Sequence, residues 1–285
     1  MDQQIGYRCN NDCLSCIIPE SAEMVKQEEY RDYVLKKIEN SDDDVLTLGG
    51  GEPTVHEGFF EFLKEVRERR PDLGMIHVLT NGRRFSDKEF ISGFEDSMEP
   101  LKFSVSMYGH TSGIHDSITR VDGSFEETVE GLKNILSEGY EADLKFIINR
   151  KNFKYIPEML KFADKNFEGV KDTVLVMPRY VGRAWRNREE IKVSFGKVVP
   201  YIEMAYEFFD TDFEVYHLPP CMLKKEVREV AMTGITKYEA DGIRFLDRCD
   251  DCALRDRCPG IWETYLMLFP DFRPRPVTPD DGHEV

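Results

Sequence analysis

Residues 4–16 read QIGYRCNNDCLSC and join a predicted β-strand to three closely spaced cysteines. Cys9, Cys13 and Cys16 have three and then two residues between them. A zinc site would require a fourth Cys or His close by, and the nearest histidine in the sequence is His56. Three thiolates would instead leave one iron of a cluster without a protein ligand. An iron that is open in this way is a site for chemistry.

Short β-type runs alternate with stretches of helical period along most of the chain, which is the pattern of a parallel sheet covered by helices. The predicted strands are Gln4–Arg8, Val45–Leu48, Met75–Leu79, Leu101–Ser106, Leu144–Ile148 and Thr173–Met177. These six units predict an α/β fold, a partial (β/α)6 barrel of the TIM type, over residues 1–211.

Helical periodicity supports the segments between these strands. Ser124 and Glu127 have the spacing of a capping box and predict where one helix begins. The apolar residues at helical spacing are Tyr30, Val34 and Ile38; Phe59, Leu63 and Val66; Phe125, Val129, Leu132 and Ile135; and Val198, Ile202, Ala205 and Phe209.

Chemically distinctive residues follow several of the predicted strands. Cys9 follows the first, Gly49–Thr54 the second, Asn81 the third and Arg179–Arg188 the sixth. In barrel enzymes the chemistry takes place at the carboxyl ends of the strands. We therefore expect these four segments to meet at one end of the barrel.

The chain is acidic, with 38 Lys and Arg against 54 Asp and Glu in 285 residues, a net charge of −16. No apolar run approaches membrane length, which excludes a bilayer-spanning protein. The charge makes nucleic-acid binding over a broad surface a poor hypothesis, because phosphate binding depends on clustered Lys and Arg. The N-terminus lacks the regions of a secretory signal. We therefore expect a cytoplasmic protein whose thiols stay reduced.

Four more cysteines lie near the end of the chain, and the total of seven is odd, so they cannot all pair as disulfides. Cys249, Cys252 and Cys258 have metal-site spacing, and Cys221 is a candidate fourth ligand. Four-cysteine zinc sites have similar spacing, so zinc and an iron–sulfur cluster both remain open for this set. We expect residues 212–270 to form this metal segment and the Pro-rich residues 271–285 to form a flexible tail.

The cysteine spacing after a first barrel strand resembles that of the radical S-adenosylmethionine (SAM) superfamily, and other segments extend the resemblance. Gly49–Thr54, GGGEPT, looks like the family's GGE segment. Thr80–Gly82 and Ser104–Ser106 are similar to its third- and fourth-strand ends, and Met177–Ala184 is similar to its sixth-strand turn. One position differs, because the residue before the last cysteine is often aromatic in the family and is Ser15 here.

The resemblance implies a 4Fe–4S cluster on Cys9, Cys13 and Cys16 whose open iron chelates SAM. An electron from a flavodoxin- or ferredoxin-type reductant then cleaves SAM, and the resulting 5′-deoxyadenosyl radical takes hydrogen from a substrate. By the same resemblance, backbone glycines approach the cofactor, a carboxylate accepts hydrogen bonds from its ammonium group and a serine contacts its ribose. The implied cofactor-binding residues are Gly50, Gly51, Glu52, Asn81, Ser106 and Gly182.

The late cysteines resemble the truncated auxiliary-cluster domain called twitch, a reduced form of the SPASM domain. Trp262 stands where the full SPASM pattern has a further cysteine, and no cysteine follows Cys258. The resemblance therefore implies one auxiliary 4Fe–4S cluster, closed by four thiolates and suited to electron transfer or structural support.

Two groups of residues are candidates for contact with the substrate. The loop after the sixth strand could bind a carboxylate, a phosphate or an acidic peptide, or could be a solvated loop paired with acids such as Glu189. His115 and Asp116 follow the fourth strand and could act as acid, base or hydrogen-bond donor, or could be structural. The arginines of the loop are Arg179, Arg183, Arg186 and Arg188.

The leading functional hypothesis is radical modification of a ribosomally made peptide, because many relatives with auxiliary clusters act on such peptides. Only eight residues precede Cys9, and we expect no peptide-recognition extension there. The alternatives are radical modification of a small metabolite, nucleotide or cofactor precursor, and modification of tRNA, which the acidic charge disfavours. A hypothesis of another class is a non-catalytic iron–sulfur electron carrier.

Overall fold

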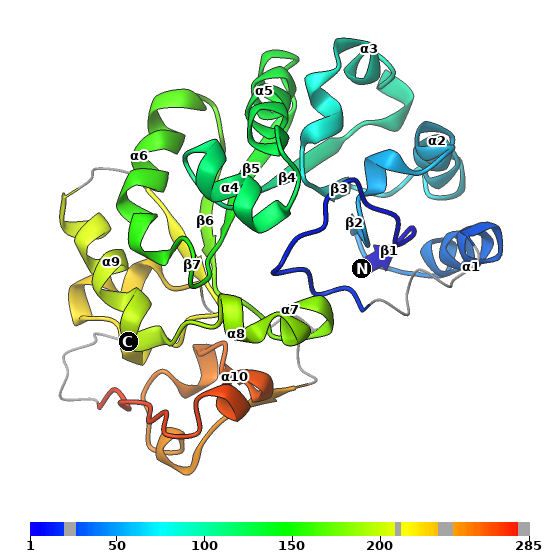
Figure 1. Cartoon of the computed structure of the whole chain (residues 1–285). Helices are drawn as coiled ribbons and strands as arrows, with labels where there is room; N and C mark the ends of the chain where they lie inside the picture. Colours follow the sequence, from blue (N-terminus) through cyan, green and yellow to red (C-terminus); the bar gives the residue numbers. More distant parts are fainter. Residues whose placement is uncertain (20–26, 209–211, 233–241, 279–285) are drawn as a thin grey trace.

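The computed structural model of the chain describes residues 1–19, 27–208, 212–232 and 242–278. Its main sheet has seven parallel strands whose spatial order follows the sequence (Figure 1). The strands are β1 Asp2–Gln4, β2 Val45–Gly49, β3 Met75–Thr80, β4 Leu101–Met107, β5 Glu141–Ile147, β6 Thr173–Val176 and β7 Glu214–Tyr216. A parallel sheet that grows one neighbour at a time, with helices between its strands, is a partial TIM-like barrel.

The strand prediction was correct for β2, β3, β4 and β6 to within about a residue and wrong in three respects. The seventh strand was missed because β7 has three residues, too few for a periodic signal. The first strand lies ahead of the predicted range Gln4–Arg8, because the chain leaves the sheet at Gly6 and turns onto the loop after β2. β5 begins at Glu141, three residues before the predicted start at Leu144.

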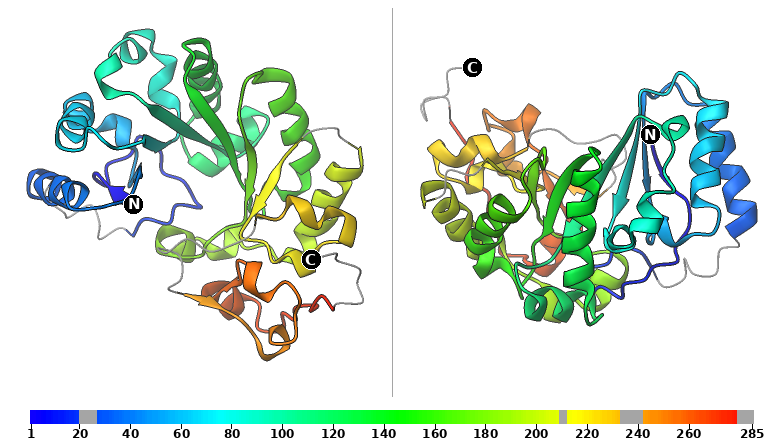
Figure 2. Two further views of the ribbon diagram at one scale, coloured as in Figure 1. Left: turned by 180° about the vertical axis from the view of Figure 1, so that it is seen from behind. Right: turned by 90° about the horizontal axis from the view of Figure 1, so that it is seen from above.

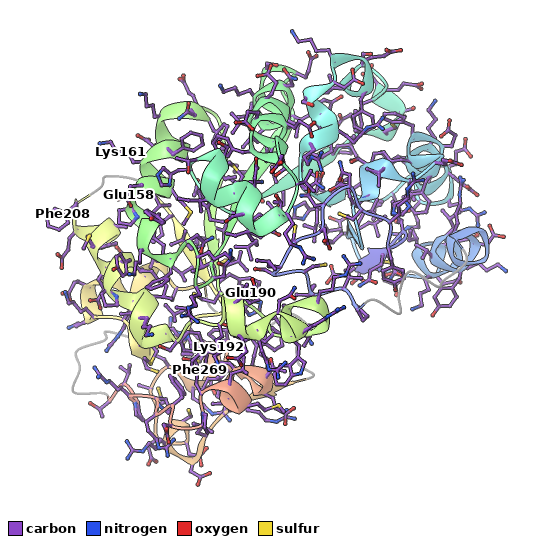
Figure 3. All side chains as sticks on the ribbon, viewed as in Figure 1. Glu158, Lys161, Glu190, Lys192, Phe208 and Phe269 are labelled. Carbon is purple, nitrogen blue, oxygen red and sulfur yellow. The ribbon has the colours of Figure 1, made fainter. Side chains whose placement is uncertain are left out.

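Helices cover the outer side of the curved sheet, as Figures 1 and 2 show. The predicted faces are buried at Val34, Ile38, Leu63 and Val66, among others, whereas the side chain of Tyr30 and all of Phe209 lie outside the described residues. Glu158 and Lys161 point outward from the sixth helix in Figure 3. The helices are α1 Gln27–Glu39, α2 Phe59–Arg69, α3 Lys88–Ile91, α4 Ser112–Thr119, α5 Ser124–Ser137, α6 Ile156–Asn166, α7 Gly182–Arg186, α8 Arg188–Ile191, α9 Phe195–Phe208 and α10 Glu263–Leu268.

The two faces of the sheet differ in polarity. On β4, Phe103 and Val105 are fully buried in the core. The intervening residues point to the inner face, where Lys102 Nζ lies 2.9 Å from Asp143 Oδ1 and Ser104 Oγ lies 2.8 Å from His77 Nε2. The inner face of this barrel is therefore polar, in contrast to the apolar face beneath the helices.

The C-terminal segment packs beside α7, α8 and α9 (Figure 1). It contains the antiparallel pair β8 Ile243–Arg244 and β9 Ile261–Trp262. Tyr265 in α10 stacks on Phe195 with 3.9 Å between ring centroids, and its hydroxyl accepts a hydrogen bond from Phe195 N at 2.9 Å. These contacts join the segment to the barrel.

The ordered packing continues past the predicted boundary at residue 270. Val277 is fully buried, and its carbonyl oxygen accepts a hydrogen bond from Ala253 N at 2.8 Å. The described part of the predicted flexible tail thus belongs to the packed segment, while residues 279–285 lie outside the described residues. Within the described residues, no helix combines the length and the apolar character that a membrane crossing requires.

The helix α5 begins where it was predicted, but the predicted capping box is absent. Gly123 is the capping residue, and Ser124 already lies inside the helix. The side chain of Asp116 caps the helix instead: its carboxylate accepts hydrogen bonds from Gly123 N at 2.9 Å, Ser124 Oγ at 2.8 Å and Phe125 N at 2.9 Å. A residue from the preceding helix therefore supplies the acceptor, which agrees with the structural alternative for Asp116.

Replacing Asp116 by Ala should lower the free energy of unfolding by about 2 kcal/mol, because the first turn of α5 loses its acceptor. Asp122→Ala is the matched control, since Asp122 is exposed and lies in the same loop. Thermal unfolding of the two variants measures the difference. Equal midpoints would contradict the capping role.

Candidate functional site

The loop that carries the first three cysteines lies against the loop after β2. Gly51 N donates to Gly6 O at 2.9 Å, and Glu52 N donates to Arg8 O at 2.8 Å. A Cβ atom on Gly50 would lie 2.1 Å from Gly6 O, and one on Gly51 would lie 2.2 Å from Arg8 O. The two backbones approach so closely that both positions require glycine, whether or not a cofactor also lies near them.

Glu52 is buried at the centre of this arrangement and is 1% exposed. Its Oε1 accepts hydrogen bonds from Thr54 N at 3.2 Å, Thr54 Oγ1 at 2.6 Å and Thr80 Oγ1 at 2.7 Å, and its Oε2 accepts one from Asn81 N at 2.6 Å. Burial raises the pKa of Glu52, and these four donors oppose the rise. Oε1 accepts three of these hydrogen bonds and Oε2 accepts only one, so Oε2 is the oxygen with room for a further donor.

Asn81 and Arg83, after β3, fasten the cysteine loop to the barrel. Asn81 Nδ2 donates to Asn10 Oδ1 at 2.7 Å. Arg83 donates through Nη1 to the carbonyl oxygen of Asn10 and, at 2.7 Å, to Asn11 Oδ1. The sequence analysis missed Arg83 and the two asparagines, although Arg83 stands directly after the Asn-Gly pair that it did identify.

The end of α4 and the segment after β5 hold the same loop. Asp12 N and Leu14 N donate to the carbonyl oxygens of Thr119 and Ile118 at the end of α4, at 3.0 and 2.9 Å. After β5, Asn149 Nδ2 donates to Ser15 Oγ at 3.2 Å. Ser15, which departs from the family pattern, therefore has a polar partner inside this chain.

The turn after β6 also packs on the cysteine loop. Ala184 N donates to Cys16 O at 2.7 Å, and Arg183 N donates to Ile18 O at 3.3 Å. Gly182 has a φ of 56°, and a Cβ atom there would lie 2.2 Å from Ile17 O. The expectation that segments following different strands meet at one end of the barrel is thus confirmed.

The three cysteines of this loop differ in exposure. Cys9 is exposed, Cys13 and Cys16 are partly buried, and Asn11 N donates to Cys9 Sγ at 3.3 Å. Burial raises the pKa of Cys9 to about 11 and that of Cys13 to about 12, the latter despite a hydrogen bond with the Tyr108 hydroxyl. Thiols of this kind become thiolates when a metal supplies the compensating positive charge.

Two further predicted site residues have different surroundings. Ser106 lies on β4, partly buried, on the same side as Lys102 and Ser104. His115 is fully buried, and its Nδ1 accepts a hydrogen bond from Tyr108 N at 3.3 Å. Burial lowers the pKa of His115 to about 4, so the ring is neutral near pH 7. A neutral imidazole enclosed in the core favours the structural role for His115 over the acid–base role.

The four predicted substrate arginines do not form one cluster. Arg183 forms an ion pair with Asp12 of the cysteine loop, with Nη1 3.1 Å from Oδ1. Arg186 is exposed. Arg188 stacks on Trp185, with 4.9 Å from its guanidinium carbon to the ring centroid, and donates to the Trp185 carbonyl oxygen at 2.9 Å. Arg179 points elsewhere and stacks on Trp262.

The four late cysteines line one apolar pocket in the C-terminal segment. Gly260 N donates to Cys258 Sγ and Val277 N to Cys252 Sγ, each at 3.4 Å, as amides do to the sulfurs of cluster ligands. Burial raises the pKa of Cys221 to about 11. The other lining residues are Pro219, Pro220, Phe245, Leu254, Arg255, Gly260, Ile261, Pro274 and Pro276.

The four cysteines that the sequence grouped are brought together around this pocket. In the described ranges, no three His, Cys, Asp or Glu side chains converge closely enough to hold a single metal ion, and this applies to Cys9, Cys13 and Cys16 as well.

The profile of the Radical SAM superfamily matches residues 4–163, more than half of the chain. This chain belongs to the radical SAM superfamily. Membership supports an enzyme that uses SAM and a 4Fe–4S cluster. The matched region contains the first cysteine loop and strands β2 to β5.

Curated relatives share parts of the chain. Pre-heme d1 synthase of Dinoroseobacter shibae is 29% identical over 51% of this chain and 34% of its own length. Mycofactocin maturase MftC of Mycobacterium ulcerans is 22% identical over 57% and 43%. The probable GTP 3′,8-cyclase of Saccharolobus islandicus is 25% identical over 70% and 63%. The aligned regions thus cover from 34% to 63% of the relatives' own lengths.

Solved structures support the fold. Streptococcus suis SuiB bound to precursor peptide SuiA superposes with a TM-score of 0.60 at 12% sequence identity, over 75% of this chain and 47% of SuiB. At that identity the likeness establishes a shared barrel architecture and nothing about the reaction.

Gly51→Ala should destabilise the cysteine loop by about 2 kcal/mol, because the new methyl group would collide with the backbone of Arg8. Gly196→Ala is the control, since a Cβ atom at Gly196 in α9 would meet open space. Thermal unfolding and the iron retained after anaerobic reconstitution measure both effects. A Gly51→Ala protein as stable and as iron-rich as the control would refute the close-packing argument.

Proposed function

We propose that this chain binds a 4Fe–4S cluster through Cys9, Cys13 and Cys16, cleaves SAM reductively and abstracts hydrogen from a peptide substrate. When bound, the cluster and SAM supply the 5′-deoxyadenosyl radical. The observation that carries the proposal is the single loop that presents three thiols and is held from the ends of β2, β3, β5 and β6. Such bracing keeps ligands fixed relative to a cofactor, as preorganised catalysis requires.

The protein would bind SAM by orienting it rather than by supplying the reactive group. The remaining acceptor capacity of Glu52 Oε2 suits the ammonium group of the cofactor, and Asn81 lies beside it. Ser106 on the inner face suits a ribose hydroxyl. The backbone around Gly182, which packs on the Cys16 loop, would border the adenine.

We further propose an auxiliary 4Fe–4S cluster held by Cys221, Cys249, Cys252 and Cys258 in a twitch-like segment. The shared pocket and the two N–H···S hydrogen bonds support a site with metal-bound thiolates, and the resemblance to the twitch segment favours a cluster over zinc. Four thiolates would complete the coordination, so this cluster would transfer electrons or support the fold and would not bind the substrate directly.

A peptide is the substrate class that we favour. Mycofactocin maturase MftC is among the relatives, and the SuiB structure, which has the same fold, contains a precursor peptide. The alternative is a nucleotide or other small metabolite, favoured by the GTP 3′,8-cyclase match, which extends over 70% of this chain. We place the reaction in the cytoplasm with a flavodoxin- or ferredoxin-type reductant.

Cys13→Ala should abolish SAM cleavage, with a loss of at least about 100-fold, because the cluster loses one of its three protein ligands. The assay measures 5′-deoxyadenosine after anaerobic reconstitution with dithionite and SAM. Asp122→Ala, remote from the site, is the control. A Cys13→Ala protein that still forms 5′-deoxyadenosine would contradict the proposal, and an unmodified protein that forms none would favour the electron carrier.

Replacing Cys9, Cys13 and Cys16 together by Ala should leave about four iron and four sulfide per chain, because the auxiliary set remains complete. Metal and acid-labile sulfide analysis, with the visible absorption spectrum, measures this. Zinc without sulfide in the triple variant would remove the second cluster from the proposal. The reciprocal control replaces all four late cysteines by Ala and leaves the first three cysteines unchanged.

A further inference from the structure

Arg179 and Trp262 form a stacked pair that has unused hydrogen-bond donors. The guanidinium carbon of Arg179 lies 4.3 Å from the centroid of the indole. Arg179 Nε and Trp262 Nε1 are both buried, and neither has a hydrogen-bond partner in the described part of the chain. An unpaired buried N–H costs about 1–3 kcal/mol, so native structures normally supply an acceptor. Here the acceptor must come from outside these residues.

Arg179 differs from Arg183 and Arg188 in the partners of its guanidinium group. Arg183 pairs with Asp12. Arg188 stacks on a tryptophan in the same way as Arg179, but it also donates to the Trp185 carbonyl oxygen. The Arg179–Trp262 pair thus shares the stacking geometry without the internal hydrogen bond, and stacking alone leaves the planar edge of the guanidinium available.

The position of the pair suits a substrate. Arg179 follows β6, at the barrel end that holds the first cysteine loop, and the same turn reaches Cys16 through Ala184 N. Trp262 belongs to the C-terminal segment, and its neighbour Ile261 lines the pocket of the late cysteines. The pair therefore lies at the junction of the two cysteine sites. Arg179 is partly buried and Trp262 is 4% exposed, while Arg179 Nε and Trp262 Nε1 are both enclosed, so the two side chains must move apart slightly for a ligand to contact both donors.

We propose that Arg179 and Trp262 bind a carboxylate of the substrate. A guanidinium edge and one indole N–H offer a single positive charge and a few directed donors, which match a planar monoanion. A phosphate dianion would call for more cationic groups than this pair offers. His217, whose ring centroid lies 4.8 Å from that of Trp262, would form one wall of the site. This inference rests on the proposed function, because it names a feature of the substrate that the radical would attack.

The test observes the indole N–H directly in the full-length, cluster-loaded protein. The chain contains two tryptophans, so an anaerobic ¹⁵N-labelled sample gives two indole signals, which Trp185→Phe assigns. The probes are N-acetylglycine for a terminal carboxylate and N-acetylaspartate α-amide for a side-chain carboxylate, with neutral N-acetylasparagine amide as the control. The Trp262 signal should shift saturably with at least one acid and not with the neutral amide.

Arg179→Gln should weaken carboxylate binding by about tenfold or more, the amount expected for loss of a charge-assisted hydrogen bond. Arg188→Gln is the matched control and should bind like the unmodified protein. If Arg179→Gln does not fold, Trp262→Phe keeps an aromatic ring for stacking and removes the indole N–H with the five-membered ring, and binding followed on the ligand signals should weaken several-fold. An unmoved Trp262 signal, or equal binding by the Arg179 and Arg188 variants, would overturn the proposal.

Two further readouts separate this inference from the proposed function. Inorganic phosphate that binds the pair as tightly as either acid would overturn the carboxylate assignment. Formation of 5′-deoxyadenosine is measured on the same samples without any probe. SAM cleavage without carboxylate binding would refute only the Arg179–Trp262 site, whereas carboxylate binding without SAM cleavage would refute the radical chemistry and leave the site in place.

Discussion

A single buried carboxylate organises the end of the barrel that carries the cysteines. Glu52 lies in the loop after β2 and accepts four hydrogen bonds, two of them from Thr80 and Asn81 at the end of β3. A buried charge is costly unless donors surround it, so the loops that provide these donors are constrained to one arrangement. The backbone of the same residue fixes Arg8, directly before the first cysteine.

The cysteine loop has almost no regular structure of its own and depends on its neighbours for its shape. Segments that follow different strands each contribute one or two contacts: Arg83 after β3, Asn149 after β5 and Ala184 after β6. Irregular backbone inside a protein requires such partners, because its N–H and C=O groups are not paired within a helix or a sheet. The loop is thus held from several directions, and its thiols are presented together.

The C-terminal segment contains the four late cysteines and packs on the barrel. It is attached through the stacking of Tyr265 on Phe195 and through the contact of Trp262 with Arg179. The second contact joins a residue at the barrel end to one whose neighbour, Ile261, lines the pocket of the late cysteines. Under our proposal, a substrate at this junction would lie between the two groups of cysteines.

The sequence by itself determined the parallel α/β fold and the grouping of seven cysteines into three and four, because spacing and hydrophobic period are local properties of a chain. Its resemblance to a known family singled out Glu52. It misplaced the cap of α5, because the acceptor belongs to Asp116 in another helix. It treated the arginines after β6 as one group, whereas each has a different partner. Only the tertiary structure decided these points. A hydrogen bond or a stacked ring depends on which distant residue the fold brings near, and local sequence patterns do not indicate that residue.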